Sequence, residues 1–353
     1  MKTALGLSYN KFFMAVIFII FRLKHWERMQ SLLTIAVLLI LLIGRTAHAA
    51  IINFSTASDA GNTAPLWIAA DLGFFEKYGN TVRLIFIQGA SVSIAALINN
   101  DVQLAQLSPM LAIGNNAKGI DFAITMSFSQ FMDNNIFGKK GLSNLRQAKS
   151  LAIGRFGSSS DFMGRYLLQR EGLKPESEVA LLQFGSQTSR ILALEASRAD
   201  AAIVTPPITL MARKKGFPLL IDASRLRIPY TSAIVVTRRS YIQAQRSVVV
   251  NFMKGLLEAI CYYKTHKEES FKVMSKYLRI QDREVLEENF RAYDHSLRPY
   301  ATNELLELPI QEVSKSDSNV MKADPSQFVD HSILKELENT GFIDRVAAQY
   351  GLK

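Results

Sequence analysis

Cysteine is nearly absent from this chain, because Cys261 is the only one among 353 residues, so no disulfide can form within the molecule. It lies in residues 252–263, whose wide apolar face is typical of a buried helix. We therefore interpret Cys261 as a buried, unreactive thiol. Histidine is also sparse after residue 49, where His266, His295 and His331 are widely separated and not at metal-ligand spacing. The sequence thus indicates neither a metal site nor a cysteine nucleophile.

Other motifs of catalysis and of nucleotide binding are missing as well. The chain has no Gly-x-Ser-x-Gly elbow, no P-loop and no dinucleotide fingerprint. We therefore expect no enzymatic activity and no cofactor.

The formal net charge of +10 comes partly from the N-terminal segment. Residues 1–50 hold six of the 41 basic and one of the 31 acidic residues, which leaves 35 and 30, or about +5, for the remainder. The short basic runs Arg213-Lys214-Lys215 and Arg238-Arg239 stand at expected element ends and form no basic stripe with interleaved aromatics. A nucleic-acid partner is not expected.

No apolar run reaches the roughly 20 residues that a membrane-spanning helix needs. Residues 12–21 and 32–43 are uncharged and strongly apolar, and the second run precedes Ala47-His48-Ala49, with small residues at the two positions that a signal peptidase reads. We interpret residues 1–49 as a secretory signal that is cleaved after Ala49, which predicts a periplasmic protein.

The first apolar run does not fit a single signal peptide, because one hydrophobic region is enough. Either translation starts at Met29 or the segment before the hydrophobic region is unusually long, and an uncleaved N-terminal anchor is a third alternative. Cys261 lies far from the cleavage point, so it is not a lipid-anchoring cysteine.

The remaining 300 residues, approximately, are enough for two domains with separate cores. Patterns of strands and helices alternate over residues 51–137 and again over residues 151–204, which predicts two α/β lobes. The polar stretch 133–141 is the expected first crossing between lobes, and residues 231–237 read as a strand that returns to the first lobe. We expect the following division: residues 50–138 and 231–353 in lobe 1, and residues 139–230 in lobe 2.

The C-terminal part is predicted to be mostly helical and to pack on the first lobe as a scaffold. The expected helices are residues 247–264, 267–278, 282–293, 302–311 and 332–339.

Residues 65–79, PLWIAADLGFFEKYG, predict a helix that stops at Gly73 and a second turn after it, followed by a buried strand over residues 82–86. This stretch resembles one protein family, the extracytoplasmic solute-binding proteins of ABC importers for nitrate, sulfonate and taurine. Further motifs follow in the order that the family shows: Gly89-Ala-Ser91, Ala95-Ala-Leu97, Asp101-Val-Gln-Leu-Ala105 and Ala117-Lys-Gly119.

The resemblance implies a two-lobe periplasmic binding protein fold of type II, each lobe a mostly parallel sheet flanked by helices. It also implies a monomer that captures a small anionic or polar organic solute between the lobes and delivers it to an ABC permease, whose ATPase is a separate subunit. Two alternatives remain at this stage. One is an enzyme on the same fold in pyrimidine or thiamine-precursor metabolism. That enzyme uses a cysteine-rich iron motif, and the single Cys261 argues against it. The other is a periplasmic ligand-sensing module.

In an α/β protein, ligands collect at the carboxyl ends of the strands, where loops lead into helix N-termini with free N–H groups. The loops expected there are rich in Ser, Thr, Gln and Gly and poor in charge. The predicted ligand-binding residues are Asn62, Gln88, Gly89, Ser91, Ser108 and Ser127 in the first lobe, and Gly157, Ser158, Ser159, Gln187 and Thr205 in the second.

Some of these residues also have a purely structural interpretation. The cradle Gly157-Ser158-Ser159 suits an oxyanion, but Ser160 capping a helix after a flexible loop explains the pattern equally. Ser108 before Pro109 is typical of a helix start and is compatible with ligand contact. Where Thr205 stands before a proline, members of the family often have an acidic residue, which places a taurine-like or cationic ligand in doubt.

Larger side chains complete the expected site. Arg155 and Arg190 are candidates to face an anion, with a solvated arginine as the alternative for each. Phe128, Phe156 and Tyr230 are candidates for apolar walls, and core packing is the alternative for them.

Overall fold

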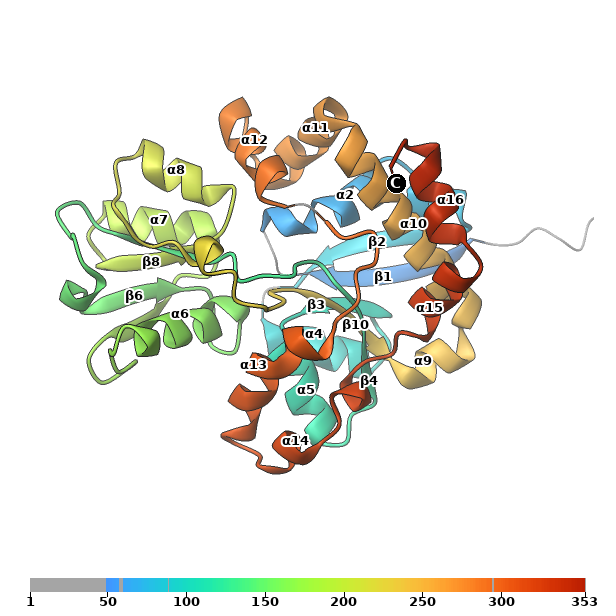
Figure 1. Ribbon diagram of the computed structural model, residues 1–353, viewed down its shortest axis with the longest axis horizontal. Coiled ribbons are helices and arrows are strands. Elements are labelled where there is room, and N and C mark those ends of the chain that lie inside the picture. The colour runs from blue at the N-terminus through green and yellow to red at the C-terminus, as the bar shows by residue number, and fades with distance from the viewer. Residues whose placement is uncertain (1–48, 57–59, 88, 294, 353) are drawn as a thin grey trace, which may run out of the picture. The chain divides into compact units, whose positions relative to one another are not determined.

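The computed structural model describes residues 49–353 except 57–59, 88, 294 and 353 (Figure 1). The predicted signal segment, apart from Ala49, and the predicted ligand residue Gln88 lie outside the described residues. Two five-stranded sheets, each flanked by helices, organise the described part of the chain. The α/β class expected from the sequence is confirmed.

The first sheet has the strand order β2-β1-β3-β10-β4. Its strands are β1 (Ala50–Thr56), β2 (Asn80–Phe86), β3 (Leu104–Leu107), β4 (Phe122–Ser127) and β10 (Ile234–Arg238). β1 pairs in parallel with β2 and β3, whereas β10 runs antiparallel between β3 and β4. The expected returning strand is therefore present as β10. It makes the sheet mixed, but the other four strands run in one direction, so the sheet is mostly parallel, as expected.

The second sheet has the strand order β7-β6-β8-β5-β9. Its strands are β5 (Asn135–Gly138), β6 (Ser150–Ile153), β7 (Ala180–Gln183), β8 (Ala201–Val204) and β9 (Leu219–Ile221). β6 is parallel to β7 and β8, and β5 is antiparallel to β8 and β9. This sheet is mixed too.

β5 lies on the other side of the expected lobe boundary. The sequence placed residues up to 138 in the first lobe, but β5 pairs with strands of the second sheet. Its sequence, Asn-Ile-Phe-Gly, is short and begins and ends with residues that are depleted in strands, so it resembles a loop. Asn135 is nonetheless buried, and its side-chain carbonyl oxygen accepts a 2.9 Å hydrogen bond from the amide of Ala223.

Between the strands, from β1 to β10, the chain forms α-helices and short 3-10 helices, the latter labelled η. They are η1 (Gly61–Thr63), α2 (Ala64–Asp71), α3 (Phe74–Lys77), α4 (Ala90–Ile98), α5 (Pro109–Ala117), η2 (Leu145–Gln147), α6 (Ser159–Arg170), α7 (Gln187–Glu195), α8 (Ile208–Lys214) and η3 (Ala223–Leu226). After β10 come α9 (Arg239–Ala244), α10 (Arg246–Thr265), α11 (Lys267–Leu278), α12 (Arg283–Ala292), α13 (Asn303–Ser314), α14 (Asn319–Lys322), η4 (Pro325–Phe328), α15 (Ser332–Asn339) and α16 (Phe342–Gln349).

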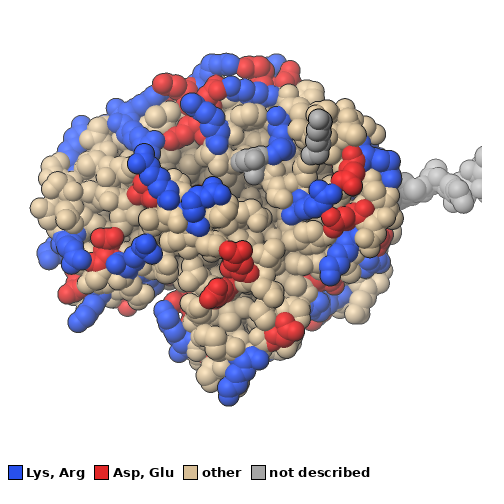
Figure 2. Space-filling view, viewed as in Figure 1, with Lys and Arg blue, Asp and Glu red and all other residues tan. Residues whose placement is uncertain are grey.

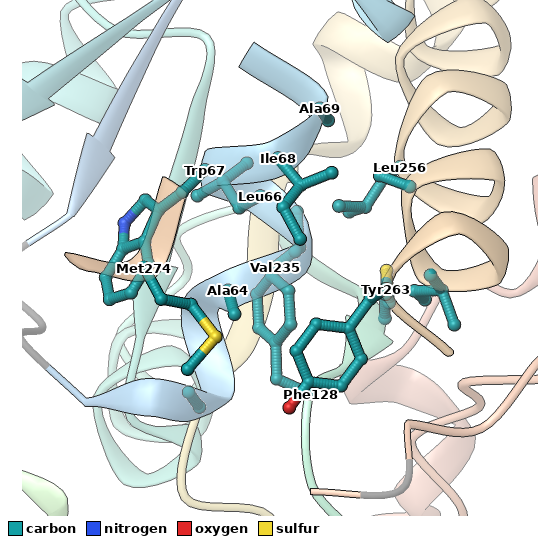
Figure 3. Close-up of a cluster of buried hydrophobic side chains, with 14 of the residues drawn as sticks. Ala64, Leu66, Trp67, Ile68, Ala69, Phe128, Val235, Leu256, Tyr263 and Met274 are labelled. Carbon is teal, nitrogen blue, oxygen red and sulfur yellow. The ribbon is translucent and has the colours of Figure 1, made fainter. Parts of the chain in front are cut away.

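The stretch that carries the family resemblance is a core element. Helix α2 packs against α10 and α11, and Figure 3 shows Ile68 of α2 beside Leu256 of α10. Trp67 stacks on Tyr277 with ring centroids 5.2 Å apart. These contacts explain the apolar residues of the motif by packing alone.

Helix α10 also approaches α3 closely, and Gly255 makes this possible. A Cβ atom at that position would lie 2.8 Å from the ring of Phe75 and 2.9 Å from the carbonyl oxygen of Phe74, closer than atoms can pack. The glycine in the middle of this long helix is therefore a packing requirement.

Cys261 lies on α10 and is buried, as expected. Burial raises the pKa of its thiol to about 11, so it stays protonated at neutral pH. Within the described residues, no helix is both long and apolar enough to cross a bilayer. On the face shown in Figure 2, basic and acidic side chains are interspersed.

The C-terminal helices do not pack on the first lobe alone. Helix α12 contacts α8 of the second lobe, where a carboxylate oxygen of Glu288 accepts hydrogen bonds from the Thr209 hydroxyl at 2.9 Å and from the Leu210 amide at 2.8 Å. Lys214 and Asp282 form a 2.6 Å ion pair beside them. The scaffold therefore bridges both lobes, which corrects the expectation from the sequence.

Candidate functional site

A cleft with a volume of about 230 Å³ lies at the carboxyl ends of strands from both sheets. Its lining includes these predicted ligand residues: Asn62, Gly89, Ser108, Ser158, Ser159, Gln187 and Thr205. The two lobes thus contribute opposite walls, in the place where an α/β protein collects its ligand.

Four helices begin at this cleft. Their N-cap residues Gly89, Ser108, Ser158 and Ser186, of α4, α5, α6 and α7, all line it. The first turn of a helix carries free N–H groups and the positive end of the helix dipole. The cleft therefore offers several converging donors to a polar or negatively charged group.

The three serines at the start of α6 make other hydrogen bonds than the sequence led us to expect. Ser158, not Ser160, caps the helix, because its hydroxyl accepts the amide of Asp161 at 3.4 Å. The Ser160 hydroxyl instead accepts the amide of Gly154 at 2.9 Å. Ser159 donates to the carbonyl of Ser232 at 2.5 Å and so reaches the opposite wall.

Gly157 does not line the cleft. It is exposed, and its amide donates to a carboxylate oxygen of Asp161 at 2.8 Å, so this N–H is already used within the loop. Its φ of +78° is one that favours glycine, which accounts for the residue type without a ligand. Its carbonyl accepts the Ser108 hydroxyl of the first lobe at 3.2 Å, a second direct link between the walls.

Ser91 and Ser127 also lie outside the cleft lining. Ser127 is buried, and its hydroxyl donates to the Ser129 carbonyl at 2.6 Å and lies 2.8 Å from the Thr231 hydroxyl. Ser91 is exposed on α4, whereas Ser93 lines the cleft. Residues two apart on a helix point to different sides, so only one of these serines can face the ligand space.

Gln187 and Thr205 form one polar unit on the second wall. The Gln187 side-chain oxygen accepts both the amide of Thr205, at 2.6 Å, and its hydroxyl, at 3.1 Å. Both residues are buried. Their mutual bonds hold two predicted ligand residues in a set orientation at the cleft.

Several lining residues were missed by the sequence interpretation, among them Ser93, Gln106, Asn134, Ser186 and Ser232. Gln106 stands in the apolar strand β3 and donates to the Thr63 hydroxyl at 3.1 Å. A polar residue within an apolar strand was the available signal. Ser232 accepts a 3.0 Å hydrogen bond from the Asn62 side chain, a link over 170 positions that no local pattern reveals.

Arg190 lines the cleft as a buried side chain and is not in solvent. It is only 5% exposed, and its guanidinium donates to the carbonyl of Ile203 and, at 3.4 Å, to that of Ser186. Arg155 lines the cleft as an exposed side chain. The described lining residues include no aspartate or glutamate, so the charged side chains at the cleft are positive.

The expected aromatic walls are only partly present. Phe156 lines the cleft, as does Phe86 at the end of β2, which the sequence interpretation did not single out. Phe128 and Tyr230 are core residues instead, and Tyr230 stacks on Phe162 with ring centroids 5.4 Å apart.

Comparisons with known proteins agree with this architecture. Residues 58–278 match the NMT1-like family. A Bacillus subtilis protein, assigned by name as an aliphatic sulfonates-binding protein, is 23% identical over 232 residues, which are 64% of this chain and 69% of that protein.

Solved structures show the same fold. A protein from Bordetella bronchiseptica superposes with a TM-score of 0.73 at 15% identity, over 82% of this chain and 98% of its own. The periplasmic aliphatic sulphonate binding protein SsuA from Escherichia coli superposes with a TM-score of 0.64 at 16% identity, over 80% and 92% respectively. The fold is therefore that of the periplasmic binding proteins, as the sequence resemblance implied.

Proposed function

The chain belongs to the NMT1-like family, and we propose that it is the extracytoplasmic solute-binding component of an ABC importer. It captures a small anionic or polar organic solute between its lobes and presents it to a membrane permease, whose ATPase is a separate subunit. The convergence of four helix N-termini and the buried Arg190 on one cleft carries this proposal.

The charge of the cleft favours an anion over a cation. A cation there would meet the positive helix ends and two arginines without a carboxylate among the described lining residues. An anionic head group would instead gain charge-assisted hydrogen bonds from amides, hydroxyls and a guanidinium. The name of the Bacillus subtilis relative and that of the Escherichia coli protein, both sulfonate binders, support the same class.

Links across the cleft suit a protein that closes on its ligand. Ser108 bonds to Gly157 and Ser159 to Ser232, so the two walls touch through hydroxyl to carbonyl hydrogen bonds. Each such bond is worth about 1 kcal/mol, which is weak enough for opening and closing to remain easy. We propose that a monomer in this closed form docks on the permease.

We expect the purified protein to bind methanesulfonate and not methylammonium, a probe of similar size and opposite charge. A bound anion stabilises the folded state by RT ln(1 + [L]/Kd), about 2.7 kcal/mol at a hundredfold excess over Kd. Thermal unfolding with each probe, followed by calorimetry, measures the difference. The recovered anion should be chemically unchanged by mass spectrometry. Binding of methylammonium alone, or conversion of the solute, would contradict the proposal.

We also expect export with cleavage after Ala49, so that the mature protein begins at Ala50. That residue is the first of β1, and its amide donates to the Gly79 carbonyl at 3.2 Å, so cleavage leaves the strand complete. N-terminal sequencing of a periplasmic fraction tests this. Recovery of the uncleaved chain from membranes would show an anchor instead.

A further inference from the structure

Two exposed aromatic side chains at the cleft are not explained by capture of a small anion alone. Phe86 is 62% exposed and Phe156 is 49% exposed, and both line the cleft. They come from different lobes, at the end of β2 and in the loop before α6. Large exposed apolar side chains gathered at a concave site are typical of ligand contacts.

Phe156 has contacts within its own lobe. Its backbone amide donates to the Gln183 side chain at 2.9 Å, and the guanidinium of Arg165 lies 5.8 Å from its ring centroid. Arg165 is itself fixed by ion pairs with Asp161 at 2.8 Å and Glu176 at 2.7 Å. A ring supported in this way loses little freedom when a ligand packs on it.

Further apolar side chains from the first lobe extend this surface. Ile87 and Leu111 line the cleft together with the two phenylalanines. A Cβ atom at Gly157 would lie 3.8 Å from Leu111, so the loop that carries Phe156 comes close to α5 of the other lobe. The cleft thus has an apolar part formed by both lobes, beside the polar part at Arg190 and the helix N-termini.

The volume of the cleft also exceeds the volume that a bare inorganic anion would fill. A water molecule occupies about 30 Å³ in the liquid, and the cleft measures about 230 Å³. An ion such as nitrate would not contact Phe86 and Phe156, and water would fill most of the cleft.

We propose that the natural solute is an organic anion with an aromatic or similarly bulky apolar group, whose head group binds at Arg190 and whose apolar group packs on Phe86 and Phe156. This inference rests on the proposed function, since it assigns the substrate class of the same cleft. The head group supplies charge recognition, and the two aromatic side chains discriminate by the tail.

The test compares benzenesulfonate with methanesulfonate by calorimetry, because the two share a head group and differ in the tail. Benzenesulfonate should bind at least tenfold more tightly. Phe86→Ala and Phe156→Ala should each reduce benzenesulfonate affinity roughly 2- to 12-fold, the range for one aromatic contact, and change methanesulfonate affinity less than twofold. Leu192→Ala, which removes an exposed apolar side chain of α7 outside the cleft lining, is the control and should change neither.

The outcomes separate this inference from the proposed function. Equal affinity for the two sulfonates, or an unchanged preference in the Phe86→Ala, Phe156→Ala double variant with an unaltered circular dichroism spectrum, would overturn the inference and leave anion capture standing. Failure of the wild-type protein to bind either sulfonate would overturn both. A preference that the double variant abolishes, with methanesulfonate still bound, supports both.

Discussion

Replacing Arg190 with glutamine is expected to weaken methanesulfonate binding about 10- to 150-fold. The guanidinium is buried at the cleft, where a charge-assisted hydrogen bond to an anion contributes about 1.5 to 3 kcal/mol. Glutamine keeps a hydrogen-bond donor, but it is shorter and carries no charge. Calorimetry on the variant and the wild type measures the loss.

Arg170→Gln is the matched control for this prediction, because Arg170 is an exposed arginine near the end of α6 in the same lobe and does not line the cleft. It should leave the affinity within twofold of the wild type. Arg190→Lys should recover part of the binding, because it restores the charge without the planar fork of donors. An Arg190→Gln variant with intact circular dichroism and unchanged affinity would place the anion elsewhere.

Replacing Glu258 with alanine is expected to lower the free energy of unfolding by about 2 to 4 kcal/mol. This carboxylate on α10 is only 2% exposed and accepts hydrogen bonds from Lys77 at 2.7 Å, Tyr78 at 2.7 Å and Tyr350 at 2.8 Å. Alanine would leave the partly buried hydroxyl groups of Tyr78 and Tyr350 without their acceptor. Urea unfolding at neutral pH measures the change.

Acid should narrow this difference. Burial raises the pKa of Glu258, but the hydrogen bonds from Lys77, Tyr78 and Tyr350 outweigh it and hold the pKa below its ordinary value. The carboxylate therefore contributes stability above its unfolded-state pKa, and that contribution is lost as the pH falls through the lower folded-state pKa.

Glu336→Ala provides the comparison for Glu258. Glu336 forms a 2.6 Å ion pair with Arg246, and both side chains are exposed, so its loss should cost no more than about 1 kcal/mol. Equal destabilisation by the two substitutions would show that the buried cluster has no special role.

The periodicity of the sequence predicted much of the secondary structure because it records local requirements. Helices α11 and α15 have the expected bounds, and Gly73 separates α2 from α3 with a φ of +74°. Strand β5 was missed because its pairing with β8 and β9 joins residues far apart in the chain, and because four residues are too few to show a period.

The candidate site was predictable only as a set of loops. Ser108 and Ser158 stand where a strand leads into a helix, so their place at the cleft follows from the topology of an α/β protein. Which side of a helix faces the cleft does not follow, and so Ser91 was chosen where Ser93 lines it. The phase of a helix about its axis is set by the partners that it packs on.

By itself, the sequence determined the α/β class, the family resemblance, the polar loops at the strand ends and the scarcity of catalytic groups. These are local or compositional properties, carried by neighbouring residues. The tertiary structure alone decided that β5 joins the second sheet, that α12 bridges to the second lobe, and that Arg190 and the two exposed phenylalanines share one cleft. These features depend on contacts between residues far apart in the chain. The burial and the electrostatic surroundings of each residue are set by such partners, which no short sequence pattern contains.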